Sequence, residues 1–294
     1  SKPKDYSKTL NNYKKNYYSQ YGEDGIIEEA LSRIPNLGKM AVEFGAWDGL
    51  YLSNTYNLAE KHDVKNVLIE ANPKKYDDLC ENYPFAGVYI NEFVGWDAHD
   101  NLESILERNN IDFAKIDVLS IDIDGNDYHI FDSLTRLRPK IICIEYNPSI
   151  PNDHVYIQKR IPGLNHACSI RAIHELGVAK GYFVVGVTDG NLILVDCKYR
   201  ELFDVSDDLN DFRDDTDSKV YAFSLFDGSI ELSKPINIFS HRVAVQNEDI
   251  QFFPSYLRQF PSNFSFFKRS IYYAFIIFKR PRKSFSYILE KLGK

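Results

Sequence analysis

The sequence predicts an α/β fold built on a doubly wound, mostly parallel sheet that ends in an antiparallel hairpin. Between residues 18 and 200, apolar segments typical of buried strands alternate with segments of helical periodicity, a pattern that favours a parallel sheet with helices on both faces. The alternation stops at two apolar segments separated by Asp189-Gly190, a dipeptide typical of tight hairpin turns. Antiparallel edge strands are common on otherwise parallel sheets, so the hairpin is expected to complete the same sheet.

The expected elements follow one another along the chain. The first is a helix at 26–34, whose apolar residues recur at helical spacing after the polar stretch Ser19–Gly25 that would cap it. Further helices are expected at 53–62, 73–82, 101–109, 127–135 and 169–180. Strands are expected at 40–44, 66–70, 87–91, 118–123, 140–145, 182–188 and 191–196.

Four segments are expected along the chain. Residues 1–17 are rich in Lys, Asn and Tyr and form an irregular arm, and residues 18–200 hold the sheet domain. Residues 201–251 contain an aspartate-rich loop and a second Asp-Gly hairpin. They are expected to pack on the sheet domain because they are too short for a core of their own. Residues 252–294 form a basic, aromatic tail.

The composition is that of a globular protein with an uneven charge distribution. Of its 294 residues 44% are hydrophobic, enough for a sizeable core. Residues 252–294 hold nine Lys or Arg and one acidic residue, a charge of +8, so the net charge of −7 leaves −15 for the rest. An acidic body argues against nucleic-acid binding, which depends on phosphate neutralisation.

The cysteines and the N-terminus indicate a cytoplasmic protein. The four cysteines are far apart and form no C-x-x-C pair, which favours reduced, buried thiols. The N-terminus is polar and lysine-rich, so no signal peptide is expected.

The basic tail indicates a membrane surface as a partner. It contains 13 aromatic residues, and its longest apolar run, Ile271–Phe278, has eight residues, whereas a spanning helix needs about 20. Pairs of basic residues flank the apolar run at Lys268-Arg269, Lys279-Arg280 and Arg282-Lys283. Such segments lie in the interface of anionic leaflets, so residues 252–294 are expected to hold the protein at the inner face of the cytoplasmic membrane. The alternative is that the tail packs on its own body or on a partner.

A glycine-bearing turn follows the first predicted strand, in Glu43-Phe-Gly-Ala-Trp-Asp-Gly49. Gly45 and Gly49 can adopt backbone angles closed to other residues and let a ligand approach the main chain. A G-x-G-x-x-G turn holds a pyrophosphate on a helix N-terminus, whereas Asp48 in this turn would repel phosphates. Glu43 and Asp48 instead suit a ligand with an ammonium group, which S-adenosylmethionine has and NAD lacks. Glu70, at the end of the next strand, is placed to accept hydrogen bonds from ribose hydroxyls.

Acidic residues also gather at the end of the fourth predicted strand. Asp122 and Asp124 would share one strand face by the period of two, at the edge where doubly wound sheets bind ligands. Crowded carboxylates imply a cation, a shared proton or a hydrogen-bonded ligand. The alternative interpretation is that Asp124–Asp127 caps the following helix.

The fifth strand adds oxygen ligands beside them. Asp124, Glu145 and Asn147 form a candidate site for Mg²⁺ or another hard divalent ion. A metal would lower the pKa of a substrate hydroxyl, and Asp127 or His154 would then act as general base. The competing interpretation is metal-free, with Asp124 as the base and Glu145 in a polar cradle.

Together these residues resemble FkbM-like S-adenosylmethionine-dependent methyltransferases of bacteria. The motifs that carry the resemblance are Ser19-Gln-Tyr-Gly-Glu-Asp-Gly25, Val42-Glu-Phe-Gly-Ala-Trp-Asp-Gly49, Leu52-Ser-Asn-Thr-Tyr56, Ser120-Ile-Asp-Ile-Asp-Gly-Asn-Asp-Tyr128 and Ile144-Glu-Tyr-Asn-Pro148. The resemblance spans residues 18–260 and implies a class I, Rossmann-like methyltransferase fold with S-adenosylmethionine as cofactor. It also implies methyl transfer to oxygen, often on a saccharide.

The resemblance further implies the residues of the cofactor site. Those expected around the cofactor are Glu43, Gly45, Ala46 and Gly49 at its methionine part, Ser53 and Asn54 at its carboxylate, Glu70 at its ribose, Trp96 and Asp97 at its adenine, and Asp122 beside them. Asp124 falls where related sugar O-methyltransferases place an acidic metal ligand or base. Asn126 stands where some of those enzymes have a catalytic Asp, which is a departure from their pattern.

We therefore expect an O-methyltransferase that acts on a sugar hydroxyl of a bacterial surface glycan, such as O-antigen or capsule, or of its precursor. The acceptor would be a glycan, a sugar nucleotide or a lipid-linked saccharide, and a homo-oligomer or a glycan-assembly complex would be a natural setting. One alternative is an NAD-dependent sugar-modifying enzyme, which would need a glycine turn that this chain lacks. The other is a non-catalytic membrane-associated scaffold, in which clustered acids would be costly to bury.

Overall fold

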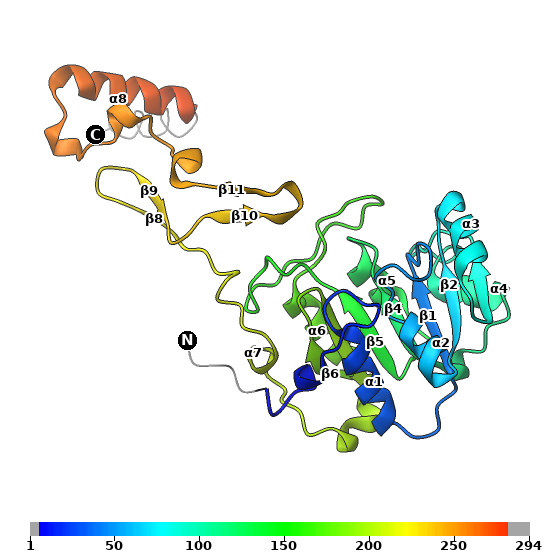
Figure 1. The fold of residues 1–294 in the computed structure, drawn as a ribbon. Helices are drawn as coiled ribbons and strands as arrows, with labels where there is room; N and C mark the ends of the chain where they lie inside the picture. The colour runs from blue at the N-terminus through cyan, green and yellow to red at the C-terminus, as the bar shows by residue number, and fades with distance from the viewer. Residues whose placement is uncertain (1–5, 282–294) are drawn as a thin grey trace. The chain divides into compact units, whose positions relative to one another are not determined.

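The computed structural model describes residues 6–281 (Figure 1). The chain divides into two units, residues 1–218 and residues 219–294. This division falls inside the segment expected at 201–251, because residues 201–218 belong to the first unit and the rest belongs to the second.

The first unit is built on one seven-stranded sheet with the order β3-β2-β1-β4-β5-β7-β6. Its strands are β1 (Met40–Phe44), β2 (Lys65–Ile69), β3 (Gly87–Ile90), β4 (Ile116–Ile121), β5 (Ile141–Glu145), β6 (Tyr182–Val187) and β7 (Asn191–Asp196). Strands β1 to β5 pair in parallel, and β7 pairs antiparallel with both β5 and β6. The predicted fold class is therefore confirmed, with the hairpin at Asp189-Gly190 as its terminal element.

The helices of the first unit fall close to the predicted ranges. They are α1 (Glu23–Arg33), α2 (Tyr56–His62), α3 (Pro73–Asn82), α4 (Leu102–Arg108), α5 (Asp127–Ser133), α6 (Ile170–Ala179) and the short α7 (Leu209–Phe212). Both ends of α3 match the prediction. Its start is fixed by Asn72, which caps it, and by Pro73, which begins it, and both signals can be recognised in the sequence. In contrast, α2 begins three residues later than predicted, since residues 53–55 bind a buried carboxylate.

Helices cover both faces of the sheet (Figure 1). A Cβ on Gly186 of β6 would lie 2.7 Å from Ile26 of α1, and Gly186 pairs with Ile193. A Cβ on Gly177 of α6 would lie 3.1 Å from Leu194 of β7. Successive strand residues point to opposite faces, so α1 and α6 pack on opposite sides of β7. This explains why every residue of β1, β4, β6 and β7 is buried, as in sheets covered on both faces.

The N-terminal arm packs on the β6 side of the sheet. The N–H of Leu10 donates to the carbonyl of Val185 (2.8 Å), and the N–H of Val187 donates to Asn11 Oδ1 (2.9 Å). Asn11 Nδ2 in turn donates to the carbonyl of Phe212 (2.6 Å). The arm, expected to be irregular, is therefore fixed to the unit by a buried asparagine and includes one 3₁₀ turn at Asn11–Tyr13.

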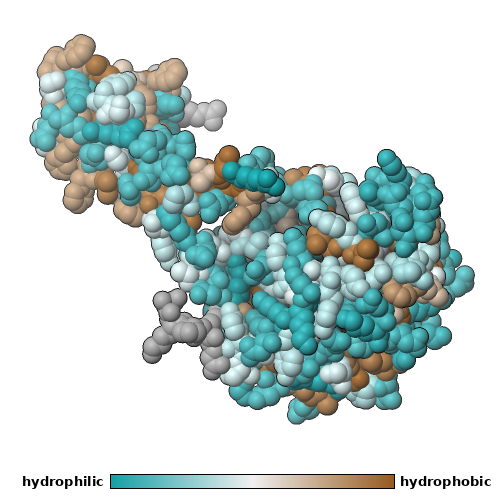
Figure 2. All heavy atoms as spheres, viewed as in Figure 1, coloured by the Kyte–Doolittle hydropathy of each residue, from teal (hydrophilic) through white to brown (hydrophobic). Residues whose placement is uncertain are grey.

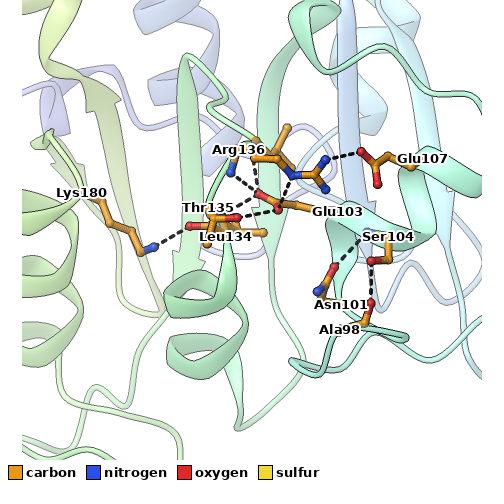
Figure 3. Close-up of polar contacts among 10 residues, drawn as sticks. Ala98, Asn101, Glu103, Ser104, Glu107, Leu134, Thr135, Arg136 and Lys180 are labelled. Atoms are coloured by element: carbon orange, nitrogen blue, oxygen red, sulfur yellow. Dashed lines mark hydrogen bonds and ion pairs between the residues drawn. The ribbon is translucent and has the colours of Figure 1, made fainter.

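A buried glutamate on α4 holds the segment that leads into β5 (Figure 3). The Glu103 carboxylate accepts hydrogen bonds from the backbone N–H groups of Thr135 (2.7 Å), Arg136 (2.6 Å) and Leu137 (2.7 Å). Burial raises the pKa of Glu103, but these backbone hydrogen bonds outweigh burial and leave the pKa below its usual value. They also explain why α5 ends at Ser133 and not at the predicted residue 135.

All four cysteines lie in the described part of the chain, and none of them forms a disulfide. Cys143 and Cys168 are buried, whereas Cys80 and Cys197 are exposed. The expectation that all four thiols are buried was therefore wrong for the latter two.

Within residues 219–281, the second unit contains two small hairpins, four short 3₁₀ turns and one longer helix. Its elements are β8 (Ala222–Ser224), β9 (Ile230–Leu232), β10 (Ile236–Ile238), β11 (Val243–Val245) and α8 (Phe266–Lys279). The second Asp-Gly hairpin is present between β8 and β9, with Gly228 in the left-handed region (φ 85°). Among residues 6–281, no helix combines the length and the apolarity that crossing a bilayer requires. The basic pair Arg282-Lys283 lies outside the described residues.

Candidate functional site

The carboxyl ends of four neighbouring strands bring the predicted site residues to one edge of the sheet. Register partners across β2, β1, β4 and β5 are Ile69, Phe44, Ile121 and Ile144. The residues that follow them in sequence, Glu70, Gly45, Asp122 and Glu145, therefore form one row along this edge. We call this row and the turns that continue from it the acidic edge.

The glycine turn after β1 needs its glycines for two reasons. Gly45 has φ 71°, and a Cβ there would lie 2.7 Å from the carbonyl oxygen of Asp122. Gly49 has φ 76°, and a Cβ there would lie 2.5 Å from Leu79. Side chains at either position would meet both steric clash and an unfavourable backbone conformation. Trp47 adopts the left-handed region as well (φ 53°), which is uncommon for a bulky residue and is often associated with functional turns.

Three residues predicted at the methionine end of the cofactor bind one another. The buried Glu43 carboxylate accepts from Ser53 Oγ (2.6 Å), Thr55 Oγ1 (2.6 Å) and the N–H of Asn54 (2.9 Å). Burial raises the pKa of Glu43, and these hydrogen bonds oppose the rise. Asn54 Nδ2 donates to Ser120 Oγ (3.0 Å) on β4. These contacts position the loop that follows the glycine turn, while direct contact with the cofactor stays a prediction.

The Glu70 carboxylate joins two turns. It accepts the N–H of Trp47 (2.8 Å) and the N–H of Asn72 (2.7 Å), so it links the glycine turn after β1 to the turn after β2. Asp48 accepts the N–H groups of Leu50 (3.0 Å) and Tyr51 (2.7 Å) within its own turn. The buried Ala46 donates its N–H to the carbonyl of Ile69 (3.2 Å). Glu70 and Asp48, which were expected to contact the ribose and the ammonium group of the cofactor, therefore already accept hydrogen bonds that hold these loops.

Asp122 and Glu145 are the two carboxyl groups with the most unusual environment. Both are half-buried, and no residue of the described chain donates a hydrogen bond to the Asp122 carboxylate. Burial, followed by the negative charges of Asp127 and Asp124, raises the pKa of Asp122 to about 8. Burial and the neighbouring Asp122 raise the pKa of Glu145 to about 9. At neutral pH these two groups hold protons that ordinary surface carboxyl groups would have lost.

Asp124 and Asp127 differ sharply in exposure. Asp124 is exposed, has φ 59°, and donates its N–H to Glu145 Oε2 (3.0 Å). β4 ends at Ile121, so Asp122 and Asp124 lie in the turn after the strand and not on one strand face, which corrects that expectation. Asp127 is fully buried and accepts the N–H groups of Ile123 and Gly125 (2.9 Å each). Burial raises the pKa of Asp127 to about 6 against the effect of these bonds.

The residues proposed as metal ligands do not fit a metal centre. Asn147 Oδ1 accepts from the N–H (2.9 Å) and the hydroxyl (2.6 Å) of Ser149, and its Nδ2 donates to the carbonyl of His166 (3.0 Å). Within residues 6–281, no three His, Cys, Asp or Glu side chains gather in an arrangement that could hold a metal ion. His154 is exposed in the connection from β5 to α6. The arrangement therefore favours the metal-free interpretation of these acids.

The connection from β5 to α6 is held against α5 by a buried glutamine. Gln158 Nε2 donates to Asn126 Oδ1 (2.8 Å), and the carbonyl of Gln158 lies 2.8 Å from His129 Nε2. Asn126, which stands in place of a catalytic Asp, is thus part of this anchor. The half-buried Trp96 ring lies 6.1 Å from the ring of His129, centroid to centroid. Trp96 therefore sits beside the start of α5, at the level of the acidic edge, whereas Asp97 is exposed in the turn before α4.

The N-terminal arm brings residues to the acidic edge that the sequence did not identify. The buried Glu23 accepts from Asn191 Nδ2 (3.1 Å) and from the N–H of Tyr21 (2.8 Å). The ring of Tyr21 packs on Gly190, where a Cβ would lie 3.1 Å from it. Burial raises the pKa of Tyr21, and the nearby charges of Asp189, Glu23, Glu145 and Asp122 add to this effect. Tyr21, which is 40% exposed, therefore packs on the turn whose next residue, Asn191, pairs with Glu145.

Asp24 completes the anchor of the arm. Its Oδ2 accepts the N–H groups of Tyr17 (2.8 Å), Tyr18 (2.8 Å) and Ser19 (2.9 Å). The segment Ser19–Gly25 thus does more than cap α1. The adjacent acids Glu23 and Asp24 at the buried start of a helix were the signal in the sequence, but Thr188 and Asn191, the partners of Glu23, lie too far along the chain to be predicted from it.

Residues 99–166 match the family model described as the methyltransferase FkbM domain. This segment is FkbM-like. The matched segment includes β4, α5, β5 and the acids Asp122, Asp124, Asp127 and Glu145. The match confirms the resemblance inferred from the motifs and supports an S-adenosylmethionine-dependent methyltransferase, without specifying the acceptor.

Solved structures of methyltransferases share weak similarity with this chain. The CurJ carbon methyltransferase is 10% identical, with 60% of this chain and 56% of that chain covered and a TM-score of 0.41. CalS10, an amino pentose methyltransferase from Micromonospora echinaspora, is 8% identical, with coverages of 59% and 89% and a TM-score of 0.36. TrmK from M. capricolum is 16% identical, with coverages of 57% and 65% and a TM-score of 0.32. No curated protein matches the chain. Similarities of this strength assign no substrate.

Proposed function

We propose that the protein is an S-adenosylmethionine-dependent O-methyltransferase that acts on a sugar hydroxyl of a bacterial surface glycan, such as O-antigen or capsule, or of its precursor. The observation that carries the proposal is the pair of half-buried carboxyl groups of Asp122 and Glu145 at neighbouring strand ends. A hydroxyl group gives up its proton as it accepts a methyl group. The best general base for that proton has a pKa near the operating pH, which the pKa of Asp122 approaches.

The acidic edge suits a positively charged cofactor. S-adenosylmethionine, when bound, supplies the methyl group, and its sulfur takes the electron pair of the breaking carbon–sulfur bond. Gly45 and Gly49 leave the main chain accessible after β1, and Glu70 stands at the end of β2. The unpartnered Asp122 carboxyl follows β4, on the other side of β1 from Glu70. It is a group that a cationic ligand would satisfy, because opposite charges stabilise the ionised form of a buried acid.

The residues of the acidic edge would move one proton in the reaction. As the acceptor oxygen bonds to the methyl carbon, its proton passes to the Asp122 carboxylate, which becomes neutral, while Glu145, with its pKa raised to about 9, stays protonated beside it. Asp127 is unsuited to this role because both of its oxygens bind backbone N–H groups and it is fully buried. The exposed Asp124 is the alternative base, and no step requires a metal.

The same carboxyl groups favour an oxygen acceptor over an amine. An amine beside these carboxyl groups would take up a proton from one of them and be held as an ammonium ion, since the ammonium and the carboxylate stabilise each other. An ammonium ion has no free electron pair with which to accept a methyl group. A hydroxyl remains neutral until its proton is removed, so it suits this edge better.

A lipid-linked saccharide would bring such a hydroxyl to a membrane surface, and a sugar nucleotide would bring it from solution. We include in the proposal a peripheral location at the inner face of the cytoplasmic membrane, where both kinds of precursor are used. Assembly into a homo-oligomer or a glycan-assembly complex would be compatible with either acceptor.

The first experiment measures cofactor binding by calorimetry with S-adenosylmethionine and with NAD. Binding of the former alone is expected, and the absence of S-adenosylmethionine binding would remove the proposal. The second incubates the protein with methyl-labelled cofactor and fractionated cell-surface glycans and locates the label chemically. Label on a sugar oxygen supports the proposal, whereas label on nitrogen or carbon contradicts it.

Matched variants of the two candidate bases then identify the proton acceptor. Asp122→Asn is expected to lower kcat by about 10² to 10⁴, the usual contribution of a general base, while S-adenosylmethionine still binds. Asp124→Asn is expected to keep most of the activity. The reverse result would make Asp124 the base and leave the methyltransferase assignment in place.

A further inference from the structure

The helix α8 carries aromatic residues on two opposite sides, and only one of these sides is packed within the second unit. Phe253 and Phe264 lie against Tyr272, with ring centroids 5.7 and 5.4 Å apart. Phe252 and Phe253 lie against Phe275, at 5.8 Å each. Tyr272 and Phe275 thus form the inner face of the helix.

The opposite side of α8 is also apolar but is exposed. Phe266, Phe267 and Phe278 are 91%, 74% and 81% exposed, and Tyr273 and Ile277 are exposed as well. Their spacing places them on one broad side of the helix, away from Tyr272 and Phe275. We call these five residues the outer face of α8. Figure 2 shows apolar side chains gathered at the surface over this helix.

An exposed face of this kind calls for a partner. Helices at the surface of a globular protein direct charged and polar residues to water, and large contiguous apolar patches mark interaction sites. Three exposed phenylalanines on one helix form an apolar surface whose contact with water is unfavourable. We therefore expect a partner to cover the outer face of α8.

The charges at the two ends of α8 indicate the partner. Lys279 and Arg280 lie over the rings of Phe275 and Phe252, at 5.9 and 5.7 Å. Lys268 and Arg269 lie near one end of α8, and Lys279 and Arg280 lie at and just beyond the other. Residues 252–281 contain no Asp or Glu. Apolar residues flanked by cations without acidic neighbours are typical of helices that lie in the interface of an anionic bilayer. A second copy of the chain fits less well, because two outer faces in contact would bring these cations together.

The length of α8 sets its orientation. Its 14 residues extend about 21 Å at 1.5 Å per residue, which is less than the hydrocarbon thickness of about 30 Å. The helix can therefore lie along the surface but cannot cross it. We propose that the outer face of α8 inserts its aromatic side chains into the interface of an anionic lipid leaflet, with the flanking cations on the lipid headgroups. This inference uses the second unit alone and does not depend on the methyl-transfer reaction.

The test is flotation of the full chain with vesicles of phosphatidylcholine, with and without phosphatidylglycerol. The protein is expected to float with the anionic vesicles and to stay largely unbound with the neutral ones. The double substitution Phe267→Asp with Phe278→Asp is expected to reduce binding by about tenfold or more, since it places charge in the apolar interface. Both residues point outward, so circular dichroism should be unchanged. Val178→Asp, at an exposed apolar residue of the first unit, is the matched control and should bind like the wild type.

A second variant isolates the electrostatic part. Lys279→Gln with Arg280→Gln should weaken binding to anionic vesicles and leave the small binding to neutral vesicles unchanged, because charge attraction to the leaflet is lost. Equal flotation of the wild type and the Phe267/Phe278 variant would overturn the proposal. So would a dimer in size-exclusion chromatography that this variant abolishes, if the wild type does not bind vesicles. Methyl transfer plays no part in any of these readouts.

Discussion

Replacing Glu103 by Ala should destabilise the first unit far more than replacing Glu107, which lies one turn away on the same helix. Both carboxylates bind Arg136, but only Glu103 also accepts three backbone N–H groups (Figure 3). Without it, the N–H of the buried Leu137 loses its acceptor at a cost of about 1 to 3 kcal/mol. The N–H groups of the more exposed Thr135 and Arg136 can turn to water, at about 1 kcal/mol each. The free energy of unfolding should therefore fall by about 3 to 5 kcal/mol, a large part of the stability of an ordinary domain.

Tryptophan fluorescence during urea unfolding is the assay. Both tryptophans, Trp47 and Trp96, belong to the first unit, so the signal reports this unit alone. Glu107→Ala is the matched control and should leave the unfolding midpoint nearly unchanged, because its exposed side chain bonds to Arg136 only. Equal midpoints for the two variants would refute the reasoning.

The difference in stability between the wild type and Glu103→Ala should depend on pH, and its sign follows from the lowered pKa of Glu103. A carboxyl group with a lowered pKa in the folded state stabilises the fold fully above its unfolded pKa of about 4.3. The contribution is lost as pH falls through the folded pKa. The difference between the wild type and Glu103→Ala should therefore shrink below about pH 4. A difference that persists undiminished at lower pH would show that the carboxylate charge is not its source.

Three further predictions concern the site. The kcat/KM should rise as pH increases through about 8, where Asp122 of the free enzyme loses its proton. Asp124→Asn should move this rise to lower pH, because it removes a negative charge that raises the pKa of Asp122, and an unchanged profile would contradict the assignment. Tyr21→Ala should raise KM for the acceptor by about tenfold, through lost aromatic contact, without changing the Kd of S-adenosylmethionine. The exposed Tyr13→Ala is its control. Chelation with EDTA should leave kcat unchanged, and recovery by Mg²⁺ of activity lost to EDTA would restore the metal hypothesis.

The sheet could be predicted from sequence because its signals are local. Asn72 and Pro73 fix the start of α3, and Asp189-Gly190 fixes the turn between β6 and β7. Strand ends were displaced by only a few residues, as at β4, which ends at Ile121 and not at residue 123. There the side chain of Asp127 binds the N–H of Ile123 and turns the chain away from the sheet, an effect that apolar periodicity does not reveal.

The candidate site was only partly accessible to the same reasoning. The row of Glu70, Asp122 and Glu145 follows from parallel strands that end at one edge, and the structure brings these residues together as expected. The hydrogen-bond partners of each carboxylate could not be predicted from the sequence. The Glu43 carboxylate accepts a hydrogen bond from Ser53 in its own loop, and Asn147 Oδ1 accepts one from the N–H of Ser149. Short-range hydrogen bonds of this kind depend on loop conformations that the sequence pattern does not determine.

The anchoring of the N-terminal arm has a consequence for how the protein is made. Glu23 binds Thr188, 165 residues later, and Asn11 binds the carbonyl of Phe212, 201 residues later. At about 5 to 20 residues per second on the ribosome, the arm waits many seconds for its partners after it emerges. Contacts between residues so distant in sequence are also slow to form. Tyr21 should therefore be among the last side chains to reach its place, and a nascent chain released before β7 would carry its sheet edge uncovered.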